Sequence, residues 1–245
     1  MRRSRRSNHD DIDGVLLVDK GTDMTSHDVV AVARRTIDQK KIGHCGTLDP
    51  LATGLLILVL GKGTKIQDLL MSEDKEYVGT MRLGQKTNTQ DSDGEVIEES
   101  EVPELSEEEI QAAFEEFTGD FHQMPPMVSA IKKDGVPLYK LARQGKEVKR
   151  DPRLVHVYKF EIQAVRLPEI DFRVVCSKGF YVRTYAHDIG EKLGCGAHLS
   201  ALRRTKSGKF SADGAITFEE LKATDRNGVR ERVLSLAEVS RLRGA

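Results

Sequence analysis

Apolar positions along the chain follow two periods, one typical of strands and one typical of helices. Continuous or alternating apolar runs predict strands at 14–19, 55–60, 75–83, 154–166 and 170–176, and a further strand within 199–210. Spacings of three and four residues predict a helix after an N-cap at Ser26 and helices at 64–71 and 181–193. Strands that come in succession, as well as in alternation with helices, predict an α/β (α+β) chain with a mixed sheet.

Three further segments complete this pattern. Ser106-Glu-Glu-Glu109 is a capping box, and the helix that it opens ends before Gly119. Met124-Pro-Pro-Met127 interrupts regular structure and opens a basic segment up to Arg153, which we interpret as part of an inserted arm at 122–153. Residues 216–245 have the apolar spacing of two short helices.

The composition is typical of a globular protein with a buried core. The chain has 245 residues, of which 38% are hydrophobic and 31% are charged, and this argues against collagen-like, coiled-coil and disordered classes. No apolar run approaches the roughly 18–20 residues that a membrane span needs, and the first residues lack the apolar stretch of a secretory signal. The three cysteines have no CxxC spacing, which argues against a zinc site. We therefore expect a cytoplasmic protein without membrane contact.

The net charge of −1 conceals a strong segregation of charge. Residues 91–116 contain twelve acidic side chains and no Lys or Arg, so the rest of the chain has a large excess of basic residues. The excess is concentrated at 132–153, at 178–209 and in the tail Arg2–Arg6. Basic patches suit a polyanionic partner such as nucleic acid, although solvated charged faces would give the same pattern.

One loop concentrates the residues that could carry chemistry. Gly43-His-Cys-Gly-Thr-Leu-Asp-Pro-Leu-Ala-Thr-Gly54 lies directly before the most apolar strand, and its glycines could let the backbone approach a ligand closely. Four interpretations stay open at this point. His44 could activate Cys45 as a thiol nucleophile, or the loop could cradle a phosphate. Asp49 could cap an Asp-Pro turn, or it could be a buried carboxylate nucleophile.

This loop closely resembles the nucleophile motif of the TruB family of tRNA pseudouridine synthases. Other segments resemble the remaining motifs of that family, in the same order, from Asp13 to Lys209. These segments are Gly14-Val-Leu-Leu-Val-Asp-Lys20 with Met24-Thr-Ser26, Lys75-Glu-Tyr77 with residues 83–94, residues 123–132 with 139–145, residues 176–184, and residues 190–198 with Leu202-Arg-Arg204.

The resemblance implies a fold, a reaction and a partner. The fold is the pseudouridine synthase fold, a mixed and mostly antiparallel central sheet flanked by helices, with an inserted RNA-binding arm. The reaction is the isomerisation of uridine 55 in the T-loop of tRNA to pseudouridine, after the base has flipped out of its stack. It requires neither a metal nor a cofactor. The partner is the T-arm of tRNA, no protein partner is required, and the enzyme is expected to be a monomer.

The resemblance also implies roles for individual residues. Asp49 is expected to be the nucleophile, attacking C1′ or C6 of the nucleotide, and Arg183 to pair with Asp49 in the site. Tyr77 is expected to stack on the flipped base or to take a proton from the sugar. The substrate-binding residues are expected to be His44, Tyr77, Tyr181 and Leu202, and the contacts to the RNA backbone Lys132, Lys146, Lys149 and Arg150.

Without the resemblance, these residues have ordinary structural interpretations. Tyr77 and Leu202 would be core side chains, and Arg183 would be a charge on a basic surface. His44 would be a loop residue that hydrogen-bonds its neighbours. One departure from the family motif bears on the chemistry. Cys45 stands where the family usually has Thr or Ser, and we expect it to pack rather than react.

We expect the chain to be organised in three parts, and we expect one function, to which there are two alternatives. A basic flexible tail at 1–12 precedes a catalytic domain at 13–215, and a short helical extension follows at 216–245, with no complete extra RNA-binding domain. The alternatives are a tRNA-folding chaperone with incidental catalysis and a guide-RNA-dependent pseudouridine synthase. Activity of the purified protein on a bare T-stem-loop would separate the stand-alone enzyme from the guide-dependent one.

Overall fold

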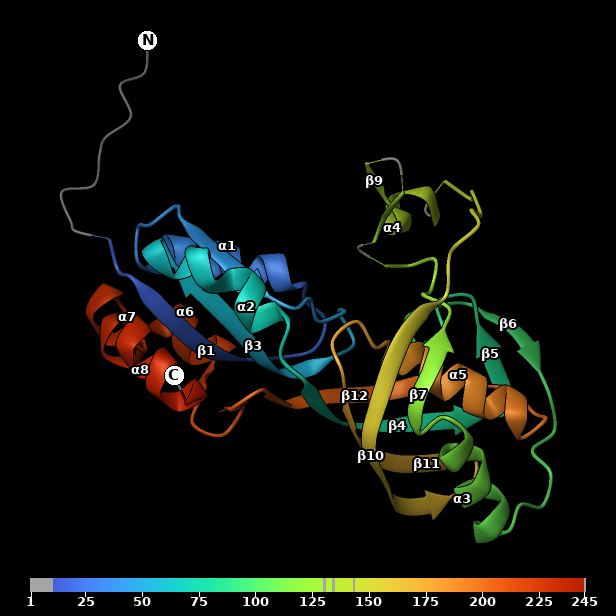
Figure 1. Ribbon diagram of the computed structural model, residues 1–245. Helices are drawn as coiled ribbons and strands as arrows, with labels where there is room; N and C mark the ends of the chain where they lie inside the picture. The colour runs from blue at the N-terminus through green and yellow to red at the C-terminus, as the bar shows by residue number, and fades with distance from the viewer. Residues whose placement is uncertain (1–10, 130, 134, 143, 245) are drawn as a thin grey trace. The chain divides into compact units, whose positions relative to one another are not determined.

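The structure is a computed structural model that describes residues 11–129, 131–133, 135–142 and 144–244 (Figure 1). The basic residues Arg2–Arg6 lie outside the described residues, and so does the side chain of Lys132. The described chain divides into two compact units. One contains the residues up to Glu73 and those from Arg203 onward, and the other contains Asp74–Leu202. No helix in the described ranges is long and apolar enough to cross a membrane.

The first unit is built around the most apolar strand of the chain. This strand, β3 (Thr53–Leu60), lies antiparallel to β1 (Gly14–Lys20) and to β2 (Ile42–Cys45), and β1 pairs in parallel with β14 (Ile216–Thr217). The last part of β12 (Ala197–Ser207) runs parallel to β3 and pairs with β13 (Phe210–Ser211). The helices of this unit are α1 (Ser26–Thr36), the 3-10 helix η1 (Gly61–Ile66), α2 (Gln67–Met71), α6 (Phe218–Ala223), α7 (Arg226–Arg232) and α8 (Leu236–Arg243).

The burial of β3 explains why its sequence is apolar without alternation. Leu55, Ile57 and Val59 belong to an apolar cluster that also contains Leu70 of α2 and Val239 of α8. The alternate side chains of β3 point to the opposite face of the sheet and are equally buried. A strand covered on both faces loses the polar positions that an exposed face would require.

The second unit is built on antiparallel strands. Their order across the sheet is the first part of β12, then β4 (Lys75–Leu83), β11 (Glu169–Cys176), β10 (Arg153–Arg166) and β7 (Gly119–Gln123). The β4–β11, β11–β10 and β10–β7 pairs are all antiparallel. A separate pair is formed by β5 (Gln85–Thr87) and β6 (Val96–Glu99).

Two helices complete the core of the second unit. These are α3 (Glu107–Glu116) and α5 (Val182–Lys192). Phe114 of α3 stacks on Phe160 of β10, with 5.5 Å between the ring centroids, and its edge meets Tyr185 of α5 at 5.8 Å. This aromatic cluster holds both helices against one face of the sheet.

The arm is made of short elements that lie beyond the ends of β7 and β10 (Figure 1). β8 (Lys132–Lys133) pairs antiparallel with β9 (Val136–Pro137), and α4 (Leu138–Ala142) follows directly. The amide of Tyr139 donates to the Ser129 carbonyl at 3.0 Å, which folds α4 back onto the start of the arm.

The expected α/β chain with a mixed, mostly antiparallel sheet is confirmed, and the strand expected at 75–83 is β4. The N-cap expected at Ser26 is wrong by one residue, because Thr25 caps α1 and Ser26 is used elsewhere. The short strand β2 overlaps the segment that was expected to be a loop, since β3 supplies the pairing that the local sequence does not reveal. Between 216 and 244 there are three helices instead of two, because Thr217, Asp225 and Ser235 each cap one.

Candidate active site

The Asp49 loop, Gly46–Ala52, connects β2 to β3 in the first unit. The backbone carbonyl of Asp49 accepts a hydrogen bond from the Ala52 amide at 3.1 Å, which closes a tight turn. Asp49 is half-buried rather than buried as expected, because the turn places it beside the exposed Pro50.

A serine at the start of α1 fixes the residue before Asp49. The hydroxyl of Ser26, which is 1% exposed, accepts from the Leu48 amide at 2.9 Å and donates to the Leu48 carbonyl at 3.1 Å. This use of the hydroxyl explains why Ser26 does not cap α1. The same two hydrogen bonds link the segment Met24-Thr-Ser26 to the Asp49 loop.

A buried lysine holds the residue after Asp49. The ammonium of Lys20, at the end of β1, donates to the carbonyls of Gly21 and Met24 at 2.8 Å and to that of Pro50 at 3.3 Å. Lys20 is fully buried, so these carbonyls compensate for the loss of water around its charge. The Asp23 amide adds a second bond to the Pro50 carbonyl at 3.1 Å.

A buried arginine contacts both ends of the loop. Arg204 of β12 is 1% exposed. Its Nε donates to the Leu55 carbonyl at 2.7 Å, and its Nη2 donates to the Gly46 carbonyl at 3.1 Å. The Asp49 loop is therefore held by Ser26, Lys20 and Arg204, none of which was expected to serve the site.

The two residues that end β2 face different surroundings. Burial, together with the nearby charges of His27 and Arg204, lowers the pKa of His44 to about 4, so its ring is neutral at pH 7. The Gln67 side chain donates to the His44 carbonyl at 3.2 Å. Cys45 is 2% exposed and packs in the apolar cluster of β1 and β3, which does not favour a thiol nucleophile.

Tyr77 and Leu202 lie on the same face of the second unit. Tyr77 is buried in β4 opposite Val174 of β11. Two residues further along β4, a Cβ added to Gly79 would lie 3.4 Å from Cδ1 of Leu202. Since residues two apart in a strand share a face, Leu202 and Tyr77 belong to one surface of the sheet.

Arg183 is buried at the start of α5, so the interpretation of a surface charge is wrong. Its Nη1 lies 3.2 Å from Oδ2 of Asp91, and both side chains are at most 5% exposed. Nη1 also donates to the Thr89 carbonyl and Nη2 to the Val128 carbonyl, each at 2.8 Å. Asp91 was not expected to take part in the site, because nothing local distinguishes it from the other acidic residues of 91–116. The expected pairing of Arg183 with Asp49 joins residues of different units and stays a prediction.

Tyr181, directly before α5, is held by a glutamine that sequence analysis also missed. Gln123 is 2% exposed and ends β7, where the arm begins. Its Oε1 accepts from the Tyr181 amide at 2.8 Å, and its Nε2 donates to the Tyr181 carbonyl at 3.0 Å. This reciprocal pair fixes the backbone of Tyr181 to the base of the arm.

The expected phosphate contacts in the arm differ in their surroundings. Lys146 and Lys149 are exposed. Arg150 is half-buried, donates to the Pro125 carbonyl at 3.0 Å and pairs with Glu147 at 3.4 Å, so it braces the arm from within. The side chain of Lys132 is outside the described residues.

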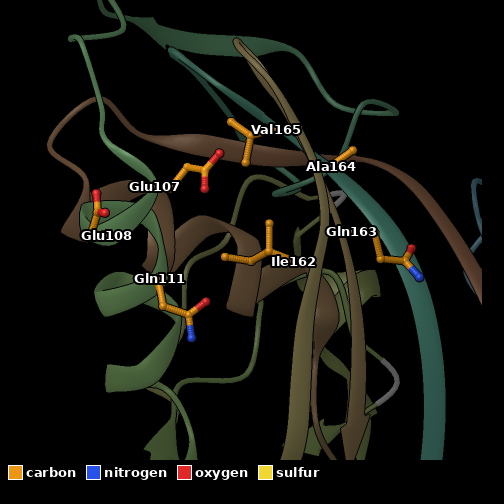
Figure 2. Close-up of a pocket in the computed structure, with 7 residues that line it drawn as sticks. All are labelled: Glu107, Glu108, Gln111, Ile162, Gln163, Ala164 and Val165. Atoms are coloured by element: carbon orange, nitrogen blue, oxygen red, sulfur yellow. The ribbon is translucent and has the colours of Figure 1, made fainter.

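A pocket of the second unit is lined by other residues. It has a volume of about 460 Å³ and is lined by Glu107, Glu108, Gln111 and residues 162–165 of β10 (Figure 2). The two carboxylates would repel a phosphate backbone. None of the expected site residues lines this pocket.

Solved structures identify the class of fold. The chain superposes on the structure of a Cbf5-Nop10-Gar1 complex with a TM-score of 0.71 and 30% identity, covering 94% of this chain and 62% of the other. It superposes on the structure of an H/ACA RNP bound to a substrate RNA containing 2'-deoxyuridine with a TM-score of 0.64 and 31% identity, covering 86% and 52%. The fold is a pseudouridine synthase fold.

Sequence comparison then gives the family. Residues 34–182 match the TruB family pseudouridylate synthase N-terminal domain, and residues 183–239 match the tRNA pseudouridylate synthase B C-terminal domain. The tRNA pseudouridine synthase B of Opitutus terrae is 54% identical over 230 residues, which is 94% of this chain and 95% of the relative. That of Syntrophotalea carbinolica is 49% identical over 94% of this chain and 75% of the relative. The chain belongs to the TruB family of pseudouridylate synthases.

Proposed function

We propose that this chain is an isomerase that converts uridine 55 in the T-loop of tRNA to pseudouridine, with Asp49 as its nucleophile. Family membership supports pseudouridine formation, and the relatives called tRNA pseudouridine synthase B support tRNA as the RNA. The observation that carries the assignment of Asp49 is the Asp49 loop itself. It carries the half-buried Asp49 on a backbone that buried side chains fix on both sides.

The reaction requires few groups besides such a carboxylate. Isomerisation breaks the C1′–N1 bond, turns the detached base and joins C1′ to C5. The Asp49 carboxylate adds to C1′ or to C6 of the nucleotide, which divides one difficult step into two easier ones. When C1′ joins C5, the hydrogen of C5 leaves as a proton and N1 takes one up, so the reaction balances. A sugar proton that is removed on the way must be returned, and the phenol of Tyr77 or Asp49 itself serves as the base.

The uridine must leave its stack before it reaches Asp49, at a cost of a few kcal/mol. Stacking on Tyr77, worth about 1–3 kcal/mol, offsets part of that cost. Leu202 lies on the same face of the sheet as Tyr77 and would form an apolar wall of the pocket. Gln123 holds the backbone of Tyr181, which would form another wall.

Arg183 would serve the site as a guanidinium fixed in advance. Its bonds to Asp91, Thr89 and Val128 leave it little freedom to reorient. A charge that is oriented before the substrate binds needs no reorganisation during the reaction. The bond to the Val128 carbonyl also links this charge to the arm.

The arm, His44 and the expected partners complete the proposal. The exposed Lys146 and Lys149 would contact phosphates of the T-arm, and His44 would contact the RNA as a neutral ring. We further propose that the enzyme acts as a monomer, requires no protein partner and works in the cytoplasm, as its tRNA substrate suggests.

Incubation of the purified protein with unmodified tRNA, followed by mapping of pseudouridine, tests this function. We expect modification at position 55 alone, and modification of a bare T-stem-loop without any added RNA or protein. A tRNA with cytidine at position 55 is the control. A requirement for a guide RNA, or modification at another position, would contradict the proposal.

The chaperone alternative is not favoured by the family or the relatives. It still makes a distinct prediction for cells that lack the enzyme. If an Asp49→Asn variant without detectable catalysis restored their growth fully, folding of tRNA and not its modification would be the main function.

A further inference from the structure

We infer that Arg204 is a positioning residue that fixes the Asp49 loop for catalysis by holding its two ends together. The inference rests on the proposed function, because it gives Arg204 a role only if the loop carries the nucleophile. Arg204 belongs to the segment Leu202-Arg-Arg204, 155 positions after Asp49, and the resemblance assigns it no role.

The side chain of Arg204 bridges the end of β2 and the start of β3. Nη2 donates to the carbonyl of Gly46, the first residue of the loop, at 3.1 Å. Nε donates to the carbonyl of Leu55, the third residue of β3, at 2.7 Å. One rigid guanidinium therefore fixes the separation of the two ends between which Asp49 is suspended.

The burial of Arg204 indicates that it does more than fill space. It is among the largest fully buried side chains of the described chain. Within the described residues its hydrogen bonds go to backbone carbonyls, and no carboxylate is paired with it. Burying an unpaired charge is costly, and an apolar side chain of similar volume would fill the same space without that cost. A guanidinium here is explained by the bonds that it makes to the loop.

Two glycines of the loop motif make room for Arg204. Gly46 has φ of +78°, and a Cβ there would lie 3.2 Å from Nη1 of Arg204. Gly54 has φ of +94°, and a Cβ there would lie 2.3 Å from the Arg204 carbonyl oxygen. At these two positions the glycines allow β12 to approach the loop. They were expected instead to let the loop backbone approach a ligand.

The geometry requires an arginine. Its two bonds diverge from one planar group toward carbonyls at opposite ends of the loop, which a single ammonium on a flexible stem cannot reproduce. The charge of Arg204 also contributes to the lowered pKa of His44, so the guanidinium acts on the β2 side of the site electrostatically as well.

The first test compares the rate of the chemical step with tRNA binding in Arg204→Lys. We expect the single-turnover rate at saturating tRNA to fall roughly 10- to 100-fold, because small displacements of a reacting group cost that much. The Kd for tRNA should stay within about twofold, since phosphates and stacking supply affinity elsewhere. Arg203→Lys is the matched control. Arg203 is the neighbouring residue of β12 and pairs with Asp19 at 2.7 Å, and its substitution should leave the rate within about twofold.

Chemical rescue separates a positioning role from a purely structural one. In Arg204→Ala, added guanidinium should restore part of the lost single-turnover rate, and sodium chloride at the same ionic strength should not. A thermal unfolding curve recorded in each solution shows whether the rescue follows stability. Recovery that followed only a rise in Tm would overturn the inference.

A glycine pair keeps the inference testable if every Arg204 variant folds poorly. Gly46→Ala forces a Cβ toward Nη1, whereas Gly214→Ala has nearly the same φ of +77° and nothing within 4 Å. We expect the first to lower the single-turnover rate several-fold more than the second. If Arg204→Met folds, Gly46→Ala added to it should cost less than in the wild-type protein, as for coupled neighbours. Equal effects of the two glycine variants, or strict additivity with Arg204→Met, would contradict the inference.

Failure of this inference can be distinguished from failure of the proposed function. If Asp49→Asn is inactive while Arg204→Lys reacts at the wild-type rate, only the role of Arg204 is wrong. If Asp49→Asn still forms pseudouridine, the assignment of the nucleophile is wrong, and the role of Arg204 falls with it.

Discussion

The Asp49 loop and the arm differ in what surrounds their functional groups. Three buried side chains, those of Lys20, Ser26 and Arg204, bond to backbone groups of the loop. In the arm, by contrast, Lys146 and Lys149 are exposed. A reacting carboxylate needs a fixed position, whereas attraction to a polyanion needs accessible charge. Under the proposed function, catalysis and substrate capture are therefore separated in the chain, and substitutions in the two regions should affect different measured quantities.

The largest effect should come from Asp49→Asn, which changes the loop and leaves the arm intact. An amide is nearly isosteric with a carboxylate but cannot act as the nucleophile, so pseudouridine formation should fall by about 10⁴-fold or more. Binding of tRNA should survive. The assay is the single-turnover rate of a preparation shown to be free of deamidated protein, and turnover near the wild-type rate would remove Asp49 from the mechanism.

Arg183→Lys should have the next largest effect, because it keeps the charge and loses the planar fork that reaches Thr89, Asp91 and Val128. Loss of one charged hydrogen bond is worth about 1.5–3 kcal/mol, which corresponds to roughly 10- to 100-fold in the rate. Arg82→Lys, which changes an exposed pair with Glu169, is the control. A loss of tRNA affinity with an unchanged rate would place Arg183 in binding.

Neutralising Lys146 and Lys149 together should change binding and spare the chemistry. If each contacts one phosphate, the slope of log K against log salt should fall by about 1.4–1.8. The rate at saturating tRNA should change little. Lys222→Ala, at an exposed pair with Glu219, controls for the loss of positive charge as such. An unchanged salt slope in the double variant would exclude both lysines from the tRNA interface.

The smallest effect should come from Cys45→Ser or Cys45→Thr, although Cys45 directly precedes the Asp49 loop. Because Cys45 packs among apolar residues, the rate should stay within about tenfold, or ~1.4 kcal/mol of barrier. Cys195→Ser, at a position that is also 2% exposed, controls for the cost of a buried hydroxyl. Abolished turnover in a folded Cys45→Ser protein would revive the thiol mechanism.

The sequence allowed the strands and the loop motif to be predicted because both are local patterns. Apolar alternation located β4, β10 and β11, and a continuous apolar run located β3. The motif around Asp49 is contiguous in the chain. Weak local signals were missed where tertiary pairing decides the structure, as for β2, whose four residues form a strand only because β3 lies beside them.

The residues that hold the site could not be predicted in the same way. Arg204 reaches Gly46 across 158 positions, and Gln123 reaches Tyr181 across 58. Asp91 lies in an acidic segment and has the same type of charge as its exposed neighbours, although it is 4% exposed. The packing of distant elements decides which of several like charges becomes buried. The residues around each charge do not reveal that packing.

The most direct test of the account measures the single-turnover rate and the Kd for tRNA on the same preparations of two proteins, Asp49→Asn and the Lys146/Lys149 double variant. The two proteins are predicted to lose different properties. Asp49→Asn should lose its rate and keep its Kd, and the lysine variant should keep its rate at saturating tRNA and lose affinity as salt is raised. If both proteins lost rate and affinity together, the separation of catalysis from substrate capture would be contradicted.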